Sequence, residues 1–316
     1  MSKPARVRRA VDGVLLLDKP TGITSNAAIQ QVKRLFSAAK AGHVGTLDPL
    51  ASGLLPVCLG EATKFSTDAF SADKSYEAEV LLGVTTTTGD REGEVITRKP
   101  VDVTREELVA VLATFTGVQA QTPPMYSALK RDGKPLYAYA RAGLTVERAP
   151  RSIAIHGITL LDFAGDRFTI DVSCTKGTYI RVLAEDIGAA LGCGATLAGL
   201  RRTRVGSFGL ADAVTLAELE QLPEARRTDS LMPVDSLADG LPALELETGA
   251  VTRILQGQGA QVDIRDDISG LVRLYGPERR FLGLGELDMN GRLLPKRLVA
   301  TSRPASSGSR APTTTS

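Results

Sequence analysis

A short stretch rich in glycine and proline, residues 42–56, constrains this chain most, because it surrounds a single carboxylate, Asp48. Pro49 lacks an amide donor and disfavours helical geometry at the residue before it, while the three glycines of the stretch permit backbone angles that other residues avoid. The stretch therefore predicts a shaped loop. Loops on a rigid scaffold often carry an enzyme's chemistry, although an isolated Asp-Pro more commonly forms a plain turn.

The composition is that of a globular protein with a substantial core. The chain has 316 residues, 43% of them hydrophobic, which is enough for one large and one small domain. No apolar run reaches membrane-spanning length, and the run at residues 14–17 is too short for a signal peptide. The three cysteines are far apart and form no Cys-x-x-Cys pair, so neither a disulfide framework nor a zinc site is expected. These features favour a cytoplasmic location.

The distribution of charge says more than the net charge of +2. Basic residues gather in two clusters, Lys130, Arg131, Lys134, Arg141, Arg148 and Arg151, and Arg201, Arg202 and Arg204. Such runs are usually solvated surface. If both clusters flank a catalytic loop in space, they would form a surface that binds phosphates.

Hydrophobic periodicity predicts the main elements. Alternation indicates strands at residues 74–83, with Tyr76 facing inward, and at residues 167–174. An apolar run predicts a buried strand at residues 13–17, and a threonine-rich turn at residues 85–90 leads to a strand at residues 93–97.

Three helices have clear start signals. One begins with Ser25 as N-cap, and another follows a capping box formed by Thr104 and Glu107. A third follows a tight turn at residues 176–178, so that Tyr179 and Arg181 lie at its start. A strand, a turn and a helix in this order hold side chains firmly at one end of a sheet.

Domain limits follow from changes in pattern. A main domain is expected at residues 11–235, and its segment 119–152 loses strict periodicity and carries tyrosines and basic residues, which suits RNA binding. A small β-rich unit is expected at residues 243–300. Residues 1–10 are expected to be a flexible basic segment and residues 301–316 a disordered tail.

The segment around Asp48 also resembles a known motif. Residues 42–64, Gly-His-Val-Gly-Thr-Leu-Asp-Pro-Leu-Ala-Ser-Gly-Leu-Leu-Pro-Val-Cys-Leu-Gly-Glu-Ala-Thr-Lys, resemble the catalytic motif of the TruB-type pseudouridine synthases, which isomerise uridine at position 55 in the T loop of tRNA. Further resemblances are Pro-Pro-x-Tyr-Ser-Ala-x-Lys at residues 123–130, Lys-Gly-Thr-Tyr-Ile-Arg-x-Leu-Ala-x-Asp-Ile-Gly at residues 176–188, and residues 199–206.

The resemblance implies a fold and a reaction. The fold would be α+β, a catalytic domain with a central mixed, largely antiparallel sheet, followed by a small β-rich RNA-binding domain of the PUA type. The enzyme would flip the uridine out, break the bond from ribose C1′ to uracil N1, turn the base and rejoin it through C5. It would need no cofactor and no metal, and would act on the T-stem loop of tRNA as a monomer without an obligate protein partner.

The resemblance also implies roles for individual residues. Asp48 would be the essential carboxylate, acting as nucleophile or as base. Arg181 would be its basic partner, favouring the charged form and orienting its oxygens. Tyr76 would stack on the target base and assist removal of the C5 proton. Tyr179 and Leu200 would line the uracil pocket, where an apolar wall strengthens electrostatic interactions by excluding water.

Three further residues would contact the RNA. His43 matches the family histidine beside the flipped base and would fill the gap that the base leaves. Lys64 would touch phosphate, and Lys130 ends the second motif. Residue chemistry alone offers an alternative for each: the histidine could make a structural hydrogen bond, and the lysines could be solvated surface residues.

Other classes of protein explain parts of the pattern. A non-catalytic RNA-binding protein could keep the scaffold, but Asp48, Tyr76 and Arg181 are all present. A phosphoryl transferase of the haloacid dehalogenase type would carry a second aspartate two residues after the first, where this chain has Leu50. A metallohydrolase would need a ligand spacing that the two histidines do not offer. Within the family, the catalytic subunit of a guide-RNA particle would have a larger C-terminal domain.

Overall fold

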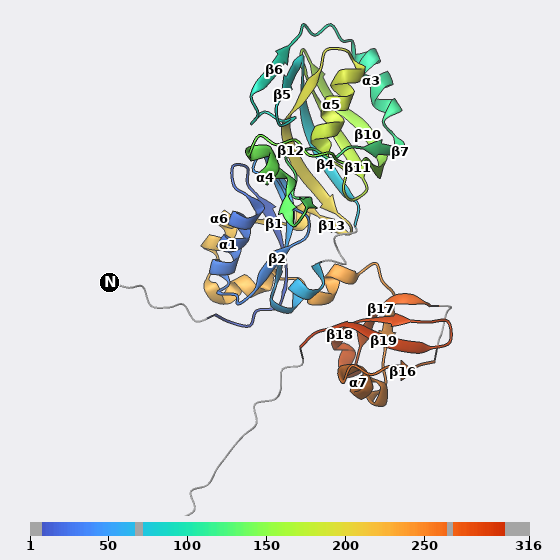
Figure 1. The fold of residues 1–316 in the computed structure, drawn as a ribbon. Helices are drawn as coiled ribbons and strands as arrows, with labels where there is room; N and C mark the ends of the chain where they lie inside the picture. Colours follow the sequence, from blue (N-terminus) through green and yellow to red (C-terminus); the bar gives the residue numbers. More distant parts are fainter. Residues whose placement is uncertain (1–7, 67–71, 264–267, 301–316) are drawn as a thin grey trace, which may run out of the picture. The chain divides into compact units, whose positions relative to one another are not determined.

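The computed structural model describes residues 8–66, 72–263 and 268–300. The chain divides into two compact units, Met1–Leu237 and Ala238–Ser316, and each is described by itself. Figure 1 shows a large sheet with helices in the first unit and a small sheet with helix α7 in the second. Among the described residues, no helix combines the length and the apolar character that crossing a membrane would need.

A ten-stranded sheet is the scaffold of the first unit, with the order β14-β1-β3-β12-β4-β11-β10-β7; β2 also pairs with β3, and β13 with β12. The pairs β1 with β14 and β3 with β12 are parallel, and the other neighbours are antiparallel. The expected α+β fold with a central mixed, largely antiparallel sheet is therefore confirmed. The strands are β1 (Gly13–Lys19), β2 (Ala41–His43), β3 (Ala51–Leu59), β4 (Lys74–Leu82), β7 (Gly117–Gln121), β10 (Arg151–Ala164), β11 (Arg167–Cys174), β12 (Ala195–Val205), β13 (Phe208–Gly209) and β14 (Val214–Thr215).

The helices of the first unit pack on this sheet. The first turn of α5 carries Arg181, and the same helix buries Leu183 and Ile187 in the core. Burying side chains of this size contributes roughly 1.5–3 kcal/mol each, so the start of α5 is held firmly. The helices are α1 (Ser25–Leu35), α3 (Arg105–Thr114), α4 (Leu136–Arg141), α5 (Ile180–Ala190) and α6 (Leu216–Gln221), with short 3-10 turns η1 (Gly60–Lys64), η2 (Leu210–Asp212), η3 (Glu224–Ser230) and η4 (Val234–Ala238).

The start signals of the helices are partly confirmed. The capping box of Thr104 and Glu107 is formed at α3. The prediction that Ser25 caps α1 is wrong, because Thr24 has the extended backbone of a cap and its Oγ1 accepts a hydrogen bond from the Ala27 N–H at 3.0 Å. Ser25 is instead the first helical residue and is buried, which frees its hydroxyl for a tertiary contact.

The stretch predicted as a single loop is shorter than expected. Residues 41–43 form β2 and residues 51–59 form β3, so only residues 44–50 lie between strands. The third residue of β3, Gly53, has to be a glycine, because its φ is +96° and a Cβ there would lie 2.3 Å from the Arg202 carbonyl oxygen of β12. The glycine therefore permits close approach of two backbones and does not mark a turn.

The predicted alternating strands are present. In β4 the side chains of Tyr76, Ala78, Val80 and Leu82 are buried, and β11 alternates in the same way. The turn after β4 leads to a two-stranded sheet of β5 (Val84–Thr86) and β6 (Val95–Arg98). Strand β6 lies close to the strand predicted at residues 93–97, whereas β5 was not predicted and overlaps the start of the turn expected at residues 85–90.

Two strands of the sheet follow no alternation in sequence. Strand β12 lies between β3 and β4 and buries consecutive residues from Ala195 to Ala198, while its second half is the basic run that suggested a surface. Strand β10 begins inside the segment 119–152, which also supplies the end of β7. The rest of that segment forms a hairpin of β8 (Lys130–Arg131) and β9 (Lys134–Pro135), and then α4.

The second unit is β-rich, as expected. Its sheet has the order β15-β17-β18-β19-β16 and packs on α7 around buried residues that include Ile254, Val272 and Leu274. Its assignment to the PUA type stays a prediction. The elements are β15 (Ala243–Glu245), α7 (Thr248–Leu255), β16 (Ala260–Gln261), β17 (Gly270–Tyr275), η5 (Pro277–Arg279), β18 (Phe281–Leu287) and β19 (Arg292–Leu298).

Both predicted terminal segments fall largely outside the described residues. Residues 1–7 and the whole of 301–316 are not described. Arg9, within the segment predicted to be flexible, exchanges backbone hydrogen bonds with Ser37 and Ala39 and pairs with Glu224 at 3.3 Å.

Candidate active site

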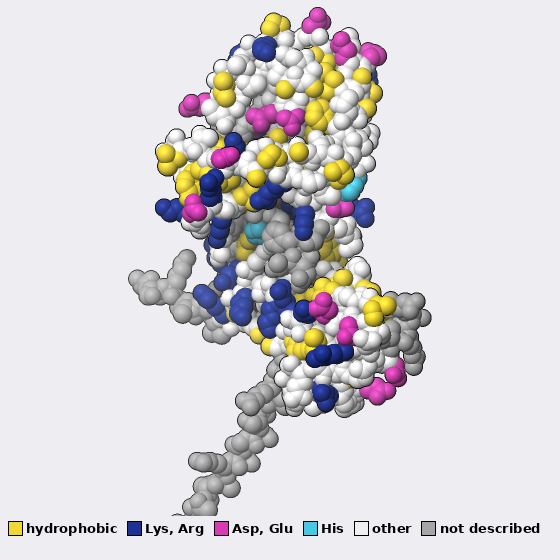
Figure 2. Space-filling view, turned by 45° about the vertical axis from the view of Figure 1, so that its right-hand side comes forward, with side chains coloured by type: hydrophobic (Ala, Val, Ile, Leu, Met, Phe, Trp, Pro, Cys, Tyr) yellow, Lys and Arg dark blue, Asp and Glu magenta, His cyan; other side chains and the backbone are white. Residues whose placement is uncertain are grey.

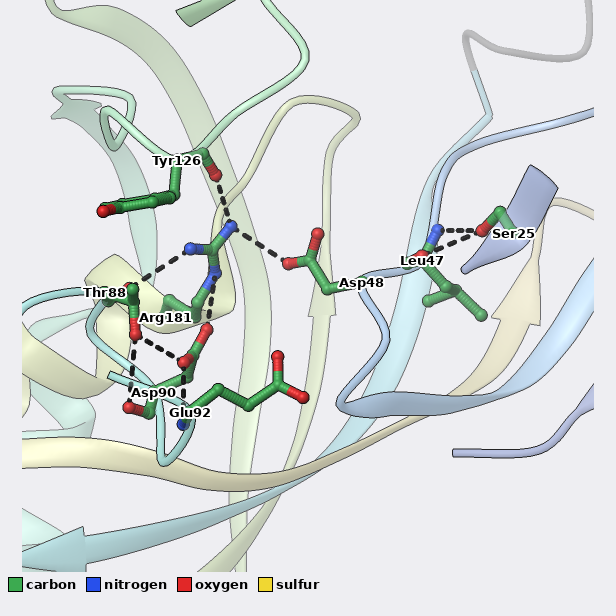
Figure 3. A network of polar contacts seen from close by, with 8 residues as sticks. All are labelled: Ser25, Leu47, Asp48, Thr88, Asp90, Glu92, Tyr126 and Arg181. Atoms are coloured by element: carbon green, nitrogen blue, oxygen red, sulfur yellow. Dashed lines mark hydrogen bonds and ion pairs between the residues drawn. The ribbon is translucent and has the colours of Figure 1, made fainter. Parts of the chain in front are cut away.

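Asp48 lies in the short connection between β2 and β3, and its backbone neighbours are tied down. The Ser25 hydroxyl donates to the Leu47 carbonyl and accepts from the Leu47 N–H, both at 2.8 Å (Figure 3). On the other side, the Gly22 N–H donates to the Pro49 carbonyl at 2.8 Å. The backbone is therefore held, whereas the Asp48 side chain remains 45% exposed and reachable by a substrate.

Arg181 faces Asp48 from the first turn of α5. Its side chain is only 7% exposed, and its Nη2 lies 3.0 Å from Asp48 Oδ2. The same guanidinium donates to the carbonyls of Tyr126 at 2.7 Å and Thr88 at 3.1 Å (Figure 3). Each of these partners comes from a different segment, so the guanidinium is fixed in one orientation and presents one edge to the carboxylate.

A second carboxylate, Asp90, holds the far side of Arg181 and was missed by the sequence reasoning. Its side chain is 6% exposed, and its Oδ2 lies 3.6 Å from Arg181 Nε. Asp90 accepts from the Thr88 hydroxyl at 2.6 Å and from the Glu92 N–H at 3.1 Å. The threonine-rich turn was recognised, but nothing in a Thr-x-Asp turn indicates that its acid is buried against a distant arginine.

A cleft of about 600 Å³ opens beside this pair. It brings together Asp48, Arg181, Tyr76, Tyr179 and Leu200, all predicted from the sequence. Burial raises the pKa of both Tyr76 and Tyr179, so both phenols are neutral at neutral pH. The cleft therefore presents the ion pair of Asp48 and Arg181 beside aromatic and apolar side chains, and its lining also includes the basic residues Lys74, Arg151, Lys176 and Arg202.

Tyr179 is positioned through its backbone. The Gln121 side chain accepts from the Tyr179 N–H at 2.8 Å and donates to its carbonyl at 3.1 Å. Gln121 is buried at the end of β7, so this clamp ties the start of α5 to the edge of the sheet. No sequence motif pointed to Gln121.

A second cleft, of about 530 Å³, shares Asp48 and Arg181 with the first. His43 lines it, together with the first turn of α1 and with Tyr137 and Arg141 of α4. Burial, reinforced by the charge of Arg202, lowers the pKa of His43, so its imidazole is neutral at neutral pH. Its Nδ1 is buried and has no hydrogen-bond partner among the described residues.

The two lysines predicted to contact RNA do not line either cleft. Lys64 ends η1 and pairs with Glu61 at 2.6 Å, and Lys130 is exposed on β8. Their predicted roles stay predictions.

The basic clusters are only partly surface. Figure 2 shows Lys and Arg side chains gathered on one face of the first unit. Arg202, however, is fully buried, and Arg201 pairs with Asp18 at 2.7 Å. Both interpretations of the second cluster, solvated surface or phosphate-binding surface, are wrong for Arg202, because it lies inside β12 between β3 and β4 and is buried, whereas Arg204 follows an irregularity of the strand and is exposed.

The described residues contain no group of three or more His, Cys, Asp or Glu side chains arranged to hold a metal ion. The three cysteines are free and buried, and burial raises the pKa of Cys58 to about 12 and of Cys174 to about 11. Asp48 is the carboxylate that lines both clefts, and Asp90 and Glu92 line the second one.

Family models match almost all of the chain. The N-terminal domain of TruB family pseudouridylate synthases matches residues 33–180, the C-terminal domain of tRNA pseudouridylate synthase B matches residues 181–239, and the C-terminal region of pseudouridine synthase II TruB matches residues 242–299. The chain belongs to the TruB family of pseudouridylate synthases, and the resemblance seen in its motifs is confirmed. As a member it is an RNA pseudouridine synthase, which is an isomerase.

Full-length relatives carry a more specific name. The chain is 58% identical to tRNA pseudouridine synthase B of Aromatoleum aromaticum, over 93% of this chain and 94% of the relative. It is 56% identical to tRNA pseudouridine synthase B of Methylobacillus flagellatus, over 93% and 97% of the two chains.

Solved structures agree on the fold. A chain in the crystal structure of a Cbf5-Nop10-Gar1 complex is 27% identical with a TM-score of 0.67, covering 93% of this chain and 85% of that one. A chain of an H/ACA RNP bound to a substrate RNA has a TM-score of 0.68 at 24% identity, covering 95% of this chain and 93% of that one, and shows likeness of fold.

Proposed function

We propose that the protein converts uridine 55 in the T loop of tRNA to pseudouridine, with Asp48 as nucleophile or base. The observation that carries the proposal is the ion pair of Asp48 and Arg181 in a cleft walled by Tyr76, Tyr179 and Leu200. The relatives named tRNA pseudouridine synthase B support tRNA as the substrate.

Each residue has a role in this reaction. Asp48 acts at the ribose or at a proton while the bond from C1′ to N1 breaks, and Arg181 pairs with it and orients its oxygens. Tyr76 stacks on the uracil and assists removal of the C5 proton after the base has turned. Tyr179 and Leu200 exclude water around the base, which strengthens the interaction of Asp48 with Arg181.

The base must leave its stack to reach Asp48. His43, on the second cleft that also contains Asp48, occupies the space that the uridine leaves. Lys64 and Lys130 contact the RNA outside the clefts, and the T-stem loop is held by charge along the basic face (Figure 2). The enzyme works in the cytoplasm as a monomer, without a cofactor, a metal or an obligate protein partner.

The experiment is tritium release from unmodified tRNA labelled at uracil C5, without added metal or nucleotide. Wild type should release tritium, and a transcript with cytidine in place of uridine 55 should lose that site's share of the release. Asp48→Asn should slow release by at least about 10⁴-fold with RNA binding retained, because it removes the reacting carboxylate and no phosphate contact.

The matched control is Asp162→Asn, which neutralises an exposed carboxylate on β10 and should leave the rate unchanged. Binding without release by the wild type would favour the non-catalytic RNA-binding protein. Release from other uridines and none from position 55 would overturn the assignment of the target.

A further inference from the structure

Arg202 occupies the centre of the sheet directly opposite a residue of the cleft. In the register of β12 with β4 it is paired with Tyr76, and in the register of β12 with β3 it is paired with Gly53. Residues directly opposite in neighbouring strands have Cβ atoms about 4.5–5.5 Å apart. Arg202 and Tyr76 both line the first cleft.

Arg202 is 1% exposed and makes two hydrogen bonds to backbone carbonyls. Its Nε donates to the Leu54 carbonyl at 2.7 Å and its Nη2 donates to the Gly45 carbonyl at 3.0 Å, while Tyr76 is its cross-strand neighbour on β4. A Cβ at Gly45, where φ is +73°, would lie 3.1 Å from Arg202 Nη1. The connection that carries Asp48 is therefore shaped around this guanidinium.

No carboxylate is paired with Arg202 in the parts of the chain that the structure describes. Burying a cation without an anion is costly, and the group it faces instead is the Tyr76 phenol. Burial is the main cause that lowers the pKa of Lys19, His43 and Lys74, and the positive charge of Arg202 lowers all three further. A structural role alone would be served more cheaply by an apolar side chain of similar volume.

We propose that Arg202 is a positioning residue of the isomerisation, which holds the Tyr76 hydroxyl against the C5 side of the bound uracil. The inference rests on the proposed function, in which Tyr76 assists removal of the C5 proton. In that step C5 is already bonded to C1′; the C5–H bond breaks and its electron pair becomes the double bond between C5 and C6, while the electron pair of the N1=C6 double bond moves to N1. The Tyr76 hydroxyl gives up its proton, which reaches N1 through water, and the Tyr76 oxygen receives the C5 proton. The neighbouring guanidinium stabilises the negative charge that develops on that oxygen.

The test is a double-mutant cycle with single-turnover rates on tRNA labelled at uracil C5. Arg202→Gln should slow the rate on the order of ten- to hundredfold, the range expected for a misplaced catalytic group, while the dissociation constant for tRNA stays unchanged. Arg202→Lys, which keeps the charge, should recover part of that loss. In a Tyr76→Phe background Arg202→Gln should cost much less than in wild type, because the hydroxyl it positions is already absent.

A deuterium isotope effect at C5 gives a second readout that a merely structural role would not move. It should be larger in Arg202→Gln than in wild type, since removal of the C5 proton becomes slower. Leu112→Ala, a buried change in α3 away from both clefts, controls for lost stability, because it should lower the melting temperature without changing the isotope effect.

A wild-type rate in folded Arg202→Gln would overturn the proposal, and so would losses that multiply fully in the Tyr76→Phe background. An unchanged isotope effect would also overturn it. Failure of the wild type to release tritium would instead refute the proposed function, so the two failures are distinguishable.

Discussion

Two buried arginines lie at the candidate site, and they differ in their partners: one is paired with carboxylates and the other is not. Arg181 lies between two carboxylates, at 3.0 Å from Asp48 and 3.6 Å from Asp90. Arg202 donates to two carbonyl oxygens, lies opposite the phenol of Tyr76, and has no carboxylate paired with it among the described residues. The difference separates two proposed roles: Arg181 pairs with the reacting carboxylate and orients it, whereas Arg202 places an unpaired positive charge beside the neutral phenol of Tyr76.

Among changes to these two arginines and their partner Asp90, the largest effect is expected from Arg181→Met, which leaves Asp48 and Asp90 without their shared cation. Breaking a buried ion pair by removing one partner costs about 3–5 kcal/mol, so unfolding in urea should show a loss of that order. Turnover should fall on the order of 10²- to 10³-fold, because Asp48 loses both its orientation and its counter-charge. Normal turnover in a folded Arg181→Met protein would remove Arg181 from the site.

Asp90→Asn should have the next largest effect. The amide keeps the shape of the side chain and can still accept from the Glu92 N–H, but it no longer pairs with Arg181. The Arg181 guanidinium would then be held less firmly in the orientation that contacts Asp48. Turnover should therefore fall on the order of tenfold, with tRNA binding retained.

Single-turnover tritium release measures this change, and Asp171→Asn, a carboxylate on β11 outside both clefts, is the matched control. Equal rates for Asp90→Asn and wild type would show that the two carbonyl contacts of Arg181 suffice.

The uncompensated charge of Arg202 should also appear in the pH dependence of stability. Burial first, and then Arg202, lowers the pKa of Lys74 from 10.5 to about 8. The unfolded chain therefore binds more protons than the folded chain between pH 8 and 10.5, so the free energy of unfolding should rise with pH in this window.

The contribution of Lys74 between pH 7 and 9.5 should reach about 2 kcal/mol by linkage. Urea unfolding at both pH values measures it, and Lys74→Met should show a smaller rise than wild type. An identical rise in the two proteins would mean that Lys74 keeps its ordinary pKa.

The same two arginines show which site residues can be predicted from the sequence and which cannot. Asp48 and Arg181 were predicted as partners because both fall in long family-like motifs, and the alternation of β4 predicted that Tyr76 is buried. Asp90 and Arg202 were not predicted, because their partners are distant in sequence: Asp90 meets Arg181 across the fold, and Arg202 meets Tyr76 through a strand pairing that periodicity does not reveal.

The strands and helices of the fold also differ in how well the sequence predicts them. Strands with one buried face, β4 and β11, were predicted closely, whereas β12, between β3 and β4, buries consecutive residues and gave no alternation. Ser25 was placed at the right helix end but in the wrong role, since local propensity cannot tell a cap from a side chain that holds the Leu47 backbone.

The smallest effect on stability is expected from Arg202→Met, although this side chain is the more deeply buried arginine. Methionine of similar length removes an unpaired cation whose burial is costly, but it leaves the Leu54 and Gly45 carbonyls without their donors and the Tyr76 hydroxyl without its neighbouring cation. These opposing changes should nearly cancel, so the free energy of unfolding should change by about 1 kcal/mol or less. Urea unfolding of Arg202→Met and Arg181→Met, measured side by side, tests this. The Arg202→Met protein should be as stable as wild type but slow in turnover. A loss of unfolding free energy as large as that of Arg181→Met would mean that Arg202 is needed to hold β3, β4 and β12 together. Both arginines would then be required for stability, although their partners differ.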